Sequence, residues 1–164
     1  MSEPSPSRSR ALPRKFLVVV DTTPESKVAI RFAARRAEHT GGTVTLVTVI
    51  PPADFQQWAG VERVMREEAL EAARQLLDGA AKVVSDIAGL QPELVVREGR
   101  TAEQVQAMIK EDKAISILVL GAGTSKEGPG PLVSAIARPG AGAYPIPVTV
   151  VPGSLTDQEV DILA

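Results

Sequence analysis

The stretch at residues 118–134 reads L-V-L-G-A-G-T-S-K-E-G-P-G-P-L-V-S and is the most informative part of the chain. An apolar run typical of a buried strand stops at Gly121, and a loop rich in Gly, Thr, Ser and Pro follows before the chain becomes apolar again. Because glycine has no Cβ, such a loop can bring backbone N–H groups close to an anion. The stretch therefore predicts a strand, a nucleotide-type loop and a helix in succession.

The alternation of strand and helix extends from this stretch toward both ends of the chain. Continuous β-branched or aliphatic runs indicate strands, and apolar residues at three- and four-residue spacing indicate helices. The expected strands are residues 16–20, 43–50, 92–97, 115–120 and 148–151, and the expected helices are residues 24–39, 61–88, 101–112 and 131–137.

Local signals mark several helix ends. Thr23 is the expected cap before Pro24, which suits a first helical position, and a Gly-Gly pair ends the same helix. Thr101 with Gln104 forms an expected capping box for the third helix. The apolar face expected for the long helix consists of Val61, Met65, Ala69, Ala72, Leu76, Ala80, Val83 and Ile87.

The strands are apolar throughout, without the alternation of a half-exposed sheet. This pattern predicts an α/β fold with an open, doubly wound, parallel five-stranded sheet covered on both faces. For the strand order 3-2-1-4-5, the winding reverses between strands one and four, and ligands bind beyond their carboxyl ends. Those ends are Asp21 and Gly121, the two most polar strand exits of the chain.

Composition bounds the remaining possibilities. The chain has 164 residues with 44% hydrophobic content, which fits one domain. A net charge of −2 and a pI near 5.5 predict neither a nucleic-acid nor a membrane partner. The absence of cysteine excludes disulfides, thiol catalysis and cysteine-ligated zinc, and His39 is the only histidine. We expect a soluble protein, because the longest apolar runs have only strand length.

Two segments flank the expected domain. Residues 1–13 are rich in Ser, Pro and Arg and lack the apolar centre of a secretory signal, so we expect a disordered, solubilising, cytoplasmic tail. Residues 153–164 form a C-terminal tail whose acidic end, 157–164, fits either a short docking helix or a frayed terminus. A frayed terminus is the favoured interpretation.

Five pieces of sequence, taken together and in order, carry a family resemblance. They are V-V-V-D at 18–21, T-L-V-T-V-I at 45–50, V-V-R-E-G-R-T-A-E-Q-V at 95–105, L-V-L-G at 118–121 and P-I-P-V-T-V-V at 145–151. Residues 14–152 resemble the universal stress protein family. The resemblance implies an adenine-nucleotide-alpha-hydrolase-like fold with flavodoxin-like layering and a cytoplasmic stress-response role. It also implies a homodimer joined through the last strand, Val148, Thr149, Val150 and Val151.

The resemblance also implies a ligand site. Family members that bind ATP carry a glycine, two residues, a glycine, nine residues, and then glycine with Ser or Thr. Laid on this chain without gaps, the pattern falls on Gly121, Thr124, Ser134 and Ala135, so only the first glycine is kept. The resemblance further places Asp21 near a ribose and the backbone of Val49 near adenine, although Asp21 is equally well explained as a turn residue. The candidate nucleotide-binding residues are Asp21, Val49, Leu120, Gly121, Gly123, Thr124, Ser134, Ala135 and Ile136.

Two functions remain open on the sequence. In the first, the protein is a dimeric stress-response module that has an unidentified protein partner, no cofactor and a degenerate loop without ATP. In the second, it is an ATP or AMP sensor, with or without weak ATP hydrolysis. We favour the first and expect no enzyme, no catalytic residues and no metal, because the chain lacks a Walker loop and a G-x-S-x-G elbow. Phe55 and Trp58 are expected in a loop packed over the crevice or the core.

Overall fold

The structure is a computed structural model that describes residues 13–52, 59–138 and 144–164. The expectations for the N-terminal tail up to residue 12 and for Phe55 and Trp58 lie outside these residues. The strands are β1 (Lys15–Val19), β2 (Thr43–Ile50), β3 (Glu93–Glu98), β4 (Ile115–Ala122) and β5 (Val148–Pro152). The helices are α1 (Pro24–Thr40), α2 (Ala59–Ala88), α3 (Thr101–Glu111), α4 (Pro131–Ala137) and α5 (Asp157–Leu163).

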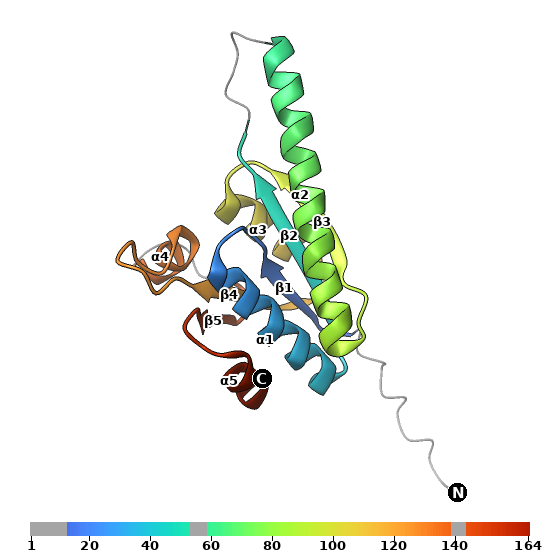
Figure 1. The fold of residues 1–164 in the computed structure, drawn as a ribbon, viewed down its shortest axis with the longest axis vertical. Helices are drawn as coiled ribbons and strands as arrows, with labels where there is room; N and C mark the ends of the chain where they lie inside the picture. Colours follow the sequence, from blue (N-terminus) through green and yellow to red (C-terminus); the bar gives the residue numbers. More distant parts are fainter. Residues whose placement is uncertain (1–12, 53–58, 139–143) are drawn as a thin grey trace, which may run out of the picture.

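The sheet has five strands in the order β3-β2-β1-β4-β5, and every pair is parallel (Figure 1). This confirms the predicted doubly wound α/β fold. The strand β4 is two residues longer than expected, because Gly121 and Ala122 still pair with Val151 and Pro152 of β5. The glycine that opens the predicted loop is therefore part of the sheet.

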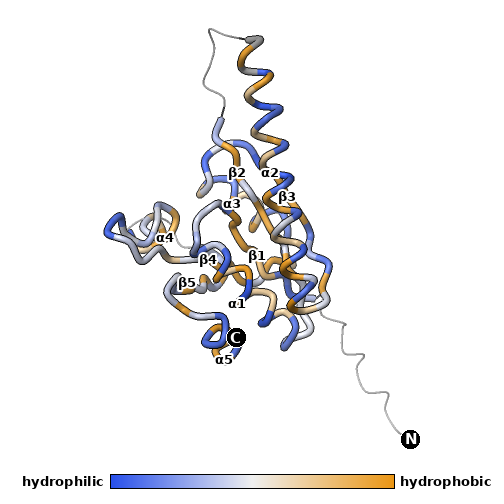
Figure 2. The backbone as a smooth tube through the Cα atoms, in the orientation of Figure 1, coloured by the Kyte–Doolittle hydropathy of each residue, from blue (hydrophilic) through white to orange (hydrophobic). Residues whose placement is uncertain are grey.

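The core lies on both faces of the sheet, as the continuous apolar strands predicted. One cluster joins strand residues such as Val18 and Leu46 to α1 and α2, and the other joins Leu17 and Val47 to α3, with α4 packed against it. Figure 2 shows the central strands as a hydrophobic layer between the helices. Because both faces of the sheet are buried, the central strands are held firmly in place. The carboxyl ends of β1 and β4 therefore lie at well-defined positions.

The first helix begins as predicted, and the third does not. Pro24 is the first residue of α1, and Gly41 ends it with φ of 70°. The predicted capping box at Thr101 is wrong: the backbone cap of α3 is Arg100, and no side chain bonds to the first turn. The side chain of Gln104 instead packs against Gly99, where an added Cβ would lie 2.8 Å from its Nε2 atom.

The long helix α2 is rotated relative to the predicted apolar face. Its buried residues are Ala73, Leu77, Ala80 and Val84, and of the predicted face only Ala80 is fully buried. Val61, Met65 and Val83 are between 42% and 53% exposed. The first turns of α2 extend past the end of the sheet (Figure 1), so the apolar side chains there have no sheet to pack against. The helix carries two adjacent rows of apolar residues, the predicted one and the buried one, and only the packing determines which row faces the core.

The C-terminal segment is an ordered helix, so the expectation of a frayed terminus is wrong. Val160 of α5 is fully buried, and α5 packs on α1. Asp161 accepts hydrogen bonds from Arg31 at 2.7 and 2.8 Å and from Arg35 at 3.0 Å. These two guanidinium groups lower the pKa of Asp161 to about 2, and Arg31 makes the larger contribution. The lone His39 places Nδ1 3.1 Å from the carbonyl oxygen of Ala164.

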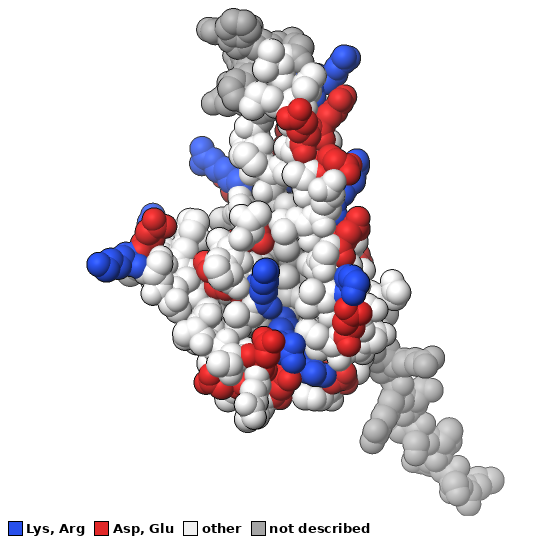
Figure 3. All heavy atoms as spheres, in the orientation of Figure 1, with Lys and Arg blue, Asp and Glu red and all other residues white. Residues whose placement is uncertain are grey.

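Acidic and basic side chains are mixed on the face of the molecule shown in Figure 3. Several of them form ion pairs along or between helices, such as Lys82 with Asp86 at 2.8 Å. On this face, the described residues form no basic stripe that would track a nucleic acid. None of the described helices has the length and apolar character of a membrane span.

Candidate functional site

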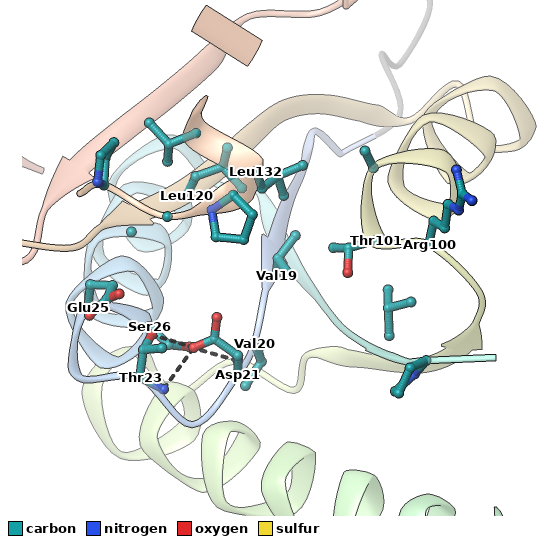
Figure 4. A pocket seen from close by; sticks show the side chains of 18 of the residues that line it. Val19, Val20, Asp21, Thr23, Glu25, Ser26, Arg100, Thr101, Leu120 and Leu132 are labelled. Carbon is teal, nitrogen blue, oxygen red and sulfur yellow. Dashed lines mark hydrogen bonds between the residues drawn. The ribbon is translucent and has the colours of Figure 1, made fainter. Parts of the chain in front are cut away.

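A cavity of about 540 Å³ opens at the carboxyl ends of β1, β2 and β4, at the switch point that the strand order predicts. Its walls are mostly apolar, with Val19, Val49, Leu120 and Leu132 among them. Figure 4 shows Leu120 and Leu132 on one side and Thr101 on the other. A volume of this size and a lining of this kind are typical of a small-molecule site.

Asp21 stands at the mouth of this cavity, held by the turn between β1 and α1 (Figure 4). Its Oδ1 accepts hydrogen bonds from the backbone N–H of Thr23 at 2.9 Å and from the Thr23 hydroxyl. Thr23 thus takes the predicted backbone cap position of α1, but its side chain serves Asp21 and does not cap the helix. The backbone N–H of Asp21 donates to the buried hydroxyl of Ser26 at 3.1 Å. These bonds orient the carboxylate at the strand exit.

Gly121 is in close contact with the first turn of α1. A Cβ added at Gly121 would lie 2.3 Å from the carbonyl oxygen of Glu25 and 2.6 Å from its carbonyl carbon. Added at Gly123, it would lie 3.1 Å from Oε1 of the same residue. The absent Cβ at Gly121 is therefore needed for α1 to pack against β4, whether or not a phosphate ever approaches it.

The loop after β4 is closed by its own hydrogen bonds. The N–H of Gly123 donates to the carbonyl of Pro129 at 3.0 Å, and the N–H of Gly128 donates to that of Ser125 at 3.1 Å. Pro129 and Pro131 have no N–H to offer. These bonds and prolines reduce the number of backbone donors that the loop presents to an anion.

The structure divides the predicted site residues into two groups. Asp21, Val49, Leu120 and Gly121 line the cavity. The residues that do not line it are Gly123, Thr124, Ser134, Ala135 and Ile136. Ile136 packs instead against the core cluster below α3, and the N–H of Ser134 is bonded to Gly130 within the helix turn. The two hydroxyl-bearing candidates, Thr124 and Ser134, are thus not part of the cavity lining.

Sequence reasoning missed several lining residues. These are Val19, Val20, Thr23, Glu25, Ser26, Pro51, Pro52, Gly99, Arg100, Thr101, Ala102, Pro129, Gly130, Pro131, Leu132 and Val133. The residues after β2 and β3 carried a usable signal, because parallel strands end at the same edge of a sheet. Glu25 carried none, since a glutamate in the first turn of a helix is commonplace.

Charged groups of opposite sign stand on opposite sides of the cavity. Asp21 and Glu25 contribute carboxylates near α1, and Arg100 lies across the cavity from Glu25 (Figure 4). The Arg100 side chain is 82% exposed and has Glu103 3.9 Å away. Such a solvated and partly neutralised cation adds little to the field inside the cavity. The described lining therefore has a net acidic character.

The fold and the cavity together indicate a general class of protein. An open parallel sheet with a cavity at its switch point, beside a strand-end carboxylate, is typical of doubly wound α/β proteins that bind small molecules. Within that class, the chain belongs to the universal stress protein family, because the family model matches residues 13–152. This confirms the resemblance that the five sequence pieces carried.

Individual relatives agree with this assignment. A universal stress protein of Mycolicibacterium smegmatis (strain ATCC 700084 / mc(2)155) is 35% identical over 108 residues, which are 65% of this chain. The matched part is only 37% of that relative, so this chain corresponds to little more than a third of it.

Solved structures share the fold at lower identity. Universal stress protein UspA from Lactobacillus plantarum has a TM-score of 0.73 at 17% identity, covering 86% of this chain and 99% of that chain. The universal stress protein from Archaeoglobus fulgidus in complex with dAMP has a TM-score of 0.59 at 16% identity, covering 85% and 97%. An Arabidopsis thaliana family member has AMP bound, and a further universal stress protein is in complex with cAMP.

Proposed function

We propose that this chain is a dimeric, cytoplasmic, non-catalytic stress-response protein whose loop after β4 does not hold ATP. Its membership of the universal stress protein family supports the stress-response role. In this role the protein acts through an unidentified protein partner.

One observation carries the proposal on ATP: the N–H of Gly123 is bonded at 3.0 Å to the carbonyl of Pro129. A triphosphate is held mainly by backbone N–H groups in a glycine-rich loop, and each group that is already bonded must break that bond first. Gly121 is part of β4 and lies opposite Val151 of β5 in the sheet.

Calorimetric titration with ATP and thermal unfolding with and without ATP test this proposal. A site with a dissociation constant of 10 µM or tighter, saturated at 1 mM ATP, would add about 2.7 kcal/mol or more to the stability. For a chain of this size, that corresponds to a rise in Tm of roughly 5–10 °C. We expect no heat of ATP binding, no such rise and no adenine nucleotide co-purifying with the protein. A saturable rise in Tm would refute the proposal.

The alternative function is an adenine-nucleotide sensor, and a specific observation favours keeping it. Structural relatives hold AMP, cAMP and dAMP, and the cavity of about 540 Å³ is large enough for such ligands. In this case, AMP or ATP would order the loop after β4 and change the choice of partner. The ATP titration separates the two functions, and AMP titrated in parallel tests the sensor with the smaller ligand.

The dimer is proposed through β5, which is an edge of the sheet. The outer side of an edge strand generally has backbone groups available for pairing. Val150 in its centre is 42% exposed. Pairing of β5 with its copy across a twofold axis would give these backbone groups hydrogen-bond partners and cover Val150.

The oligomeric state of two variants tests this interface. We expect Val150→Lys to convert the dimer into a monomer in light scattering after gel filtration, because a charge would lie in an apolar contact. Val83→Lys on α2 is the matched control, since Val83 is also 42% exposed, and it should remain dimeric. A monomeric wild-type protein, or a dimeric Val150→Lys variant, would contradict the interface.

A further inference from the structure

Glu25 places a carboxylate beside the loop that would receive a phosphate. It is the second residue of α1, is half-buried and lines the cavity (Figure 4). A Cβ on Gly123 would lie 3.1 Å from Glu25 Oε1, so this oxygen faces the loop backbone directly. The Cβ of Glu25 also lies close to Gly153, where an added Cβ would be 2.9 Å away.

Nothing among the described residues neutralises this carboxylate. The hydrogen bonds and ion pairs within 13–52, 59–138 and 144–164 give Glu25 no side-chain partner. The nearest loop cation in sequence, Lys126, is exposed and does not line the cavity. Arg100 lies on the far side. A phosphate at the loop would therefore meet an unpaired negative charge in a partly enclosed site, where repulsion is stronger than in water.

The rest of the cavity suits a ligand without phosphate. Its apolar walls, with Val49 and Leu120 among them, fit a flat ring. Oδ1 of Asp21 is held by Thr23, and this turn aims the carboxylate at the strand exit, where it can accept hydrogen bonds from ligand hydroxyls. A ring joined to vicinal hydroxyls is the chemistry of a nucleoside.

We infer that Glu25 is a specificity-determining residue that excludes phosphorylated ligands, and that the cavity accepts an uncharged adenine nucleoside. This inference rests on the proposed function, in which ATP is not bound. It adds the reason why phosphorylated ligands are excluded and the class of ligand that is accepted. Adenosine presents the ring to the apolar walls and the ribose to Asp21, and it ends before the carboxylate of Glu25. AMP and ATP extend a negative charge toward that carboxylate.

Calorimetric titrations of adenosine, AMP and ATP against the full chain test the inference. We expect the wild-type protein to bind adenosine at least about tenfold more tightly than AMP, which is about 1.4 kcal/mol, and ATP more weakly still. Glu25→Gln keeps the size of the side chain and removes its charge. The ratio of AMP affinity to adenosine affinity should rise about tenfold in this variant. The rise should shrink at high salt, because screening weakens the repulsion.

Glu127→Gln is the control variant, since Glu127 is an exposed residue of the same loop that does not line the cavity. It should leave the affinity ratio at the wild-type value, and an equal rise in both variants would overturn the role of Glu25. If the wild-type protein binds neither adenosine nor ATP, the ligand class is wrong and the proposed function stands. If it binds ATP as tightly as adenosine, the proposed function fails as well. An unchanged ratio in folded Glu25→Gln would also overturn the inference.

Discussion

Substituting Gly121 by alanine distinguishes two reasons for a glycine at the end of β4. If the glycine serves only a phosphate, the folded protein tolerates a Cβ, because Gly121 does not have a positive φ. A Gly→Ala change at a compatible position stabilises a protein by about 0.4–1 kcal/mol, through the lower entropy of the unfolded chain. If the glycine serves the packing of α1, the same change destabilises the fold. The two explanations predict opposite signs.

The contact distances favour the packing explanation. The new Cβ would be 2.3 Å from the carbonyl oxygen of Glu25, and this oxygen belongs to the backbone of α1 and moves only with the helix. Overpacking in a core costs about 1–3 kcal/mol, and a clash with backbone belongs at the upper end of that range. After subtracting the entropic gain, we expect a net loss of about 2 kcal/mol. For a chain of this size, Tm would fall by roughly 4–8 °C.

Thermal unfolding followed by circular dichroism, together with urea unfolding to check for an unchanged slope, measures this loss. Gly79→Ala is the matched control, because Gly79 lies within α2 and an added Cβ would contact nothing within 4 Å. It should raise the stability by about 1 kcal/mol, through helix propensity alone. A Gly121→Ala variant as stable as the wild-type protein, or more stable, would refute the packing argument.

Three further changes test the energetics of the fold. Thr45→Val should stabilise by about 1 kcal/mol in urea unfolding, because the buried Thr45 hydroxyl has no hydrogen-bond partner among the described residues. Thr48→Val on the same strand should destabilise by about 1 kcal/mol, because the Thr48 hydroxyl donates to the Val20 carbonyl at 2.7 Å; equal effects of the two changes would contradict this account. Asp161→Asn should lower Tm at pH 7, with the difference from the wild-type protein closing as pH falls toward 2. The pKa of Asp161 is about 2 in the folded protein and 3.8 ordinarily, so its carboxylate stabilises the fold fully above pH 3.8 and loses this effect as pH falls through 2. A difference in Tm that persists undiminished at pH 2 would contradict this explanation.

Part of the site could be predicted from the sequence because it lies at strand ends. Asp21 and Gly121 follow apolar runs, and in a parallel sheet such ends meet at one edge. Thr124 and Ser134 were placed in the site by a spaced motif, which says nothing about the direction of a loop. The loop closes on itself through Gly123 and Pro129, so these hydroxyls lie away from the cavity.

The sequence by itself determined the class of fold, the strand order through the family resemblance, the first residue of α1 and the edge of the sheet that carries the cavity. The class of fold, the start of α1 and the sheet edge follow from periodicity and turn chemistry, which act over a few neighbouring residues. The strand order is instead what the resemblance implies. Only the tertiary structure decided which face of α2 is buried, that Asp161 joins α5 to Arg31, and that Glu25 faces Gly123. Each of these contacts joins residues far apart in the chain. Packing selects among side-chain partners that no short window of sequence contains.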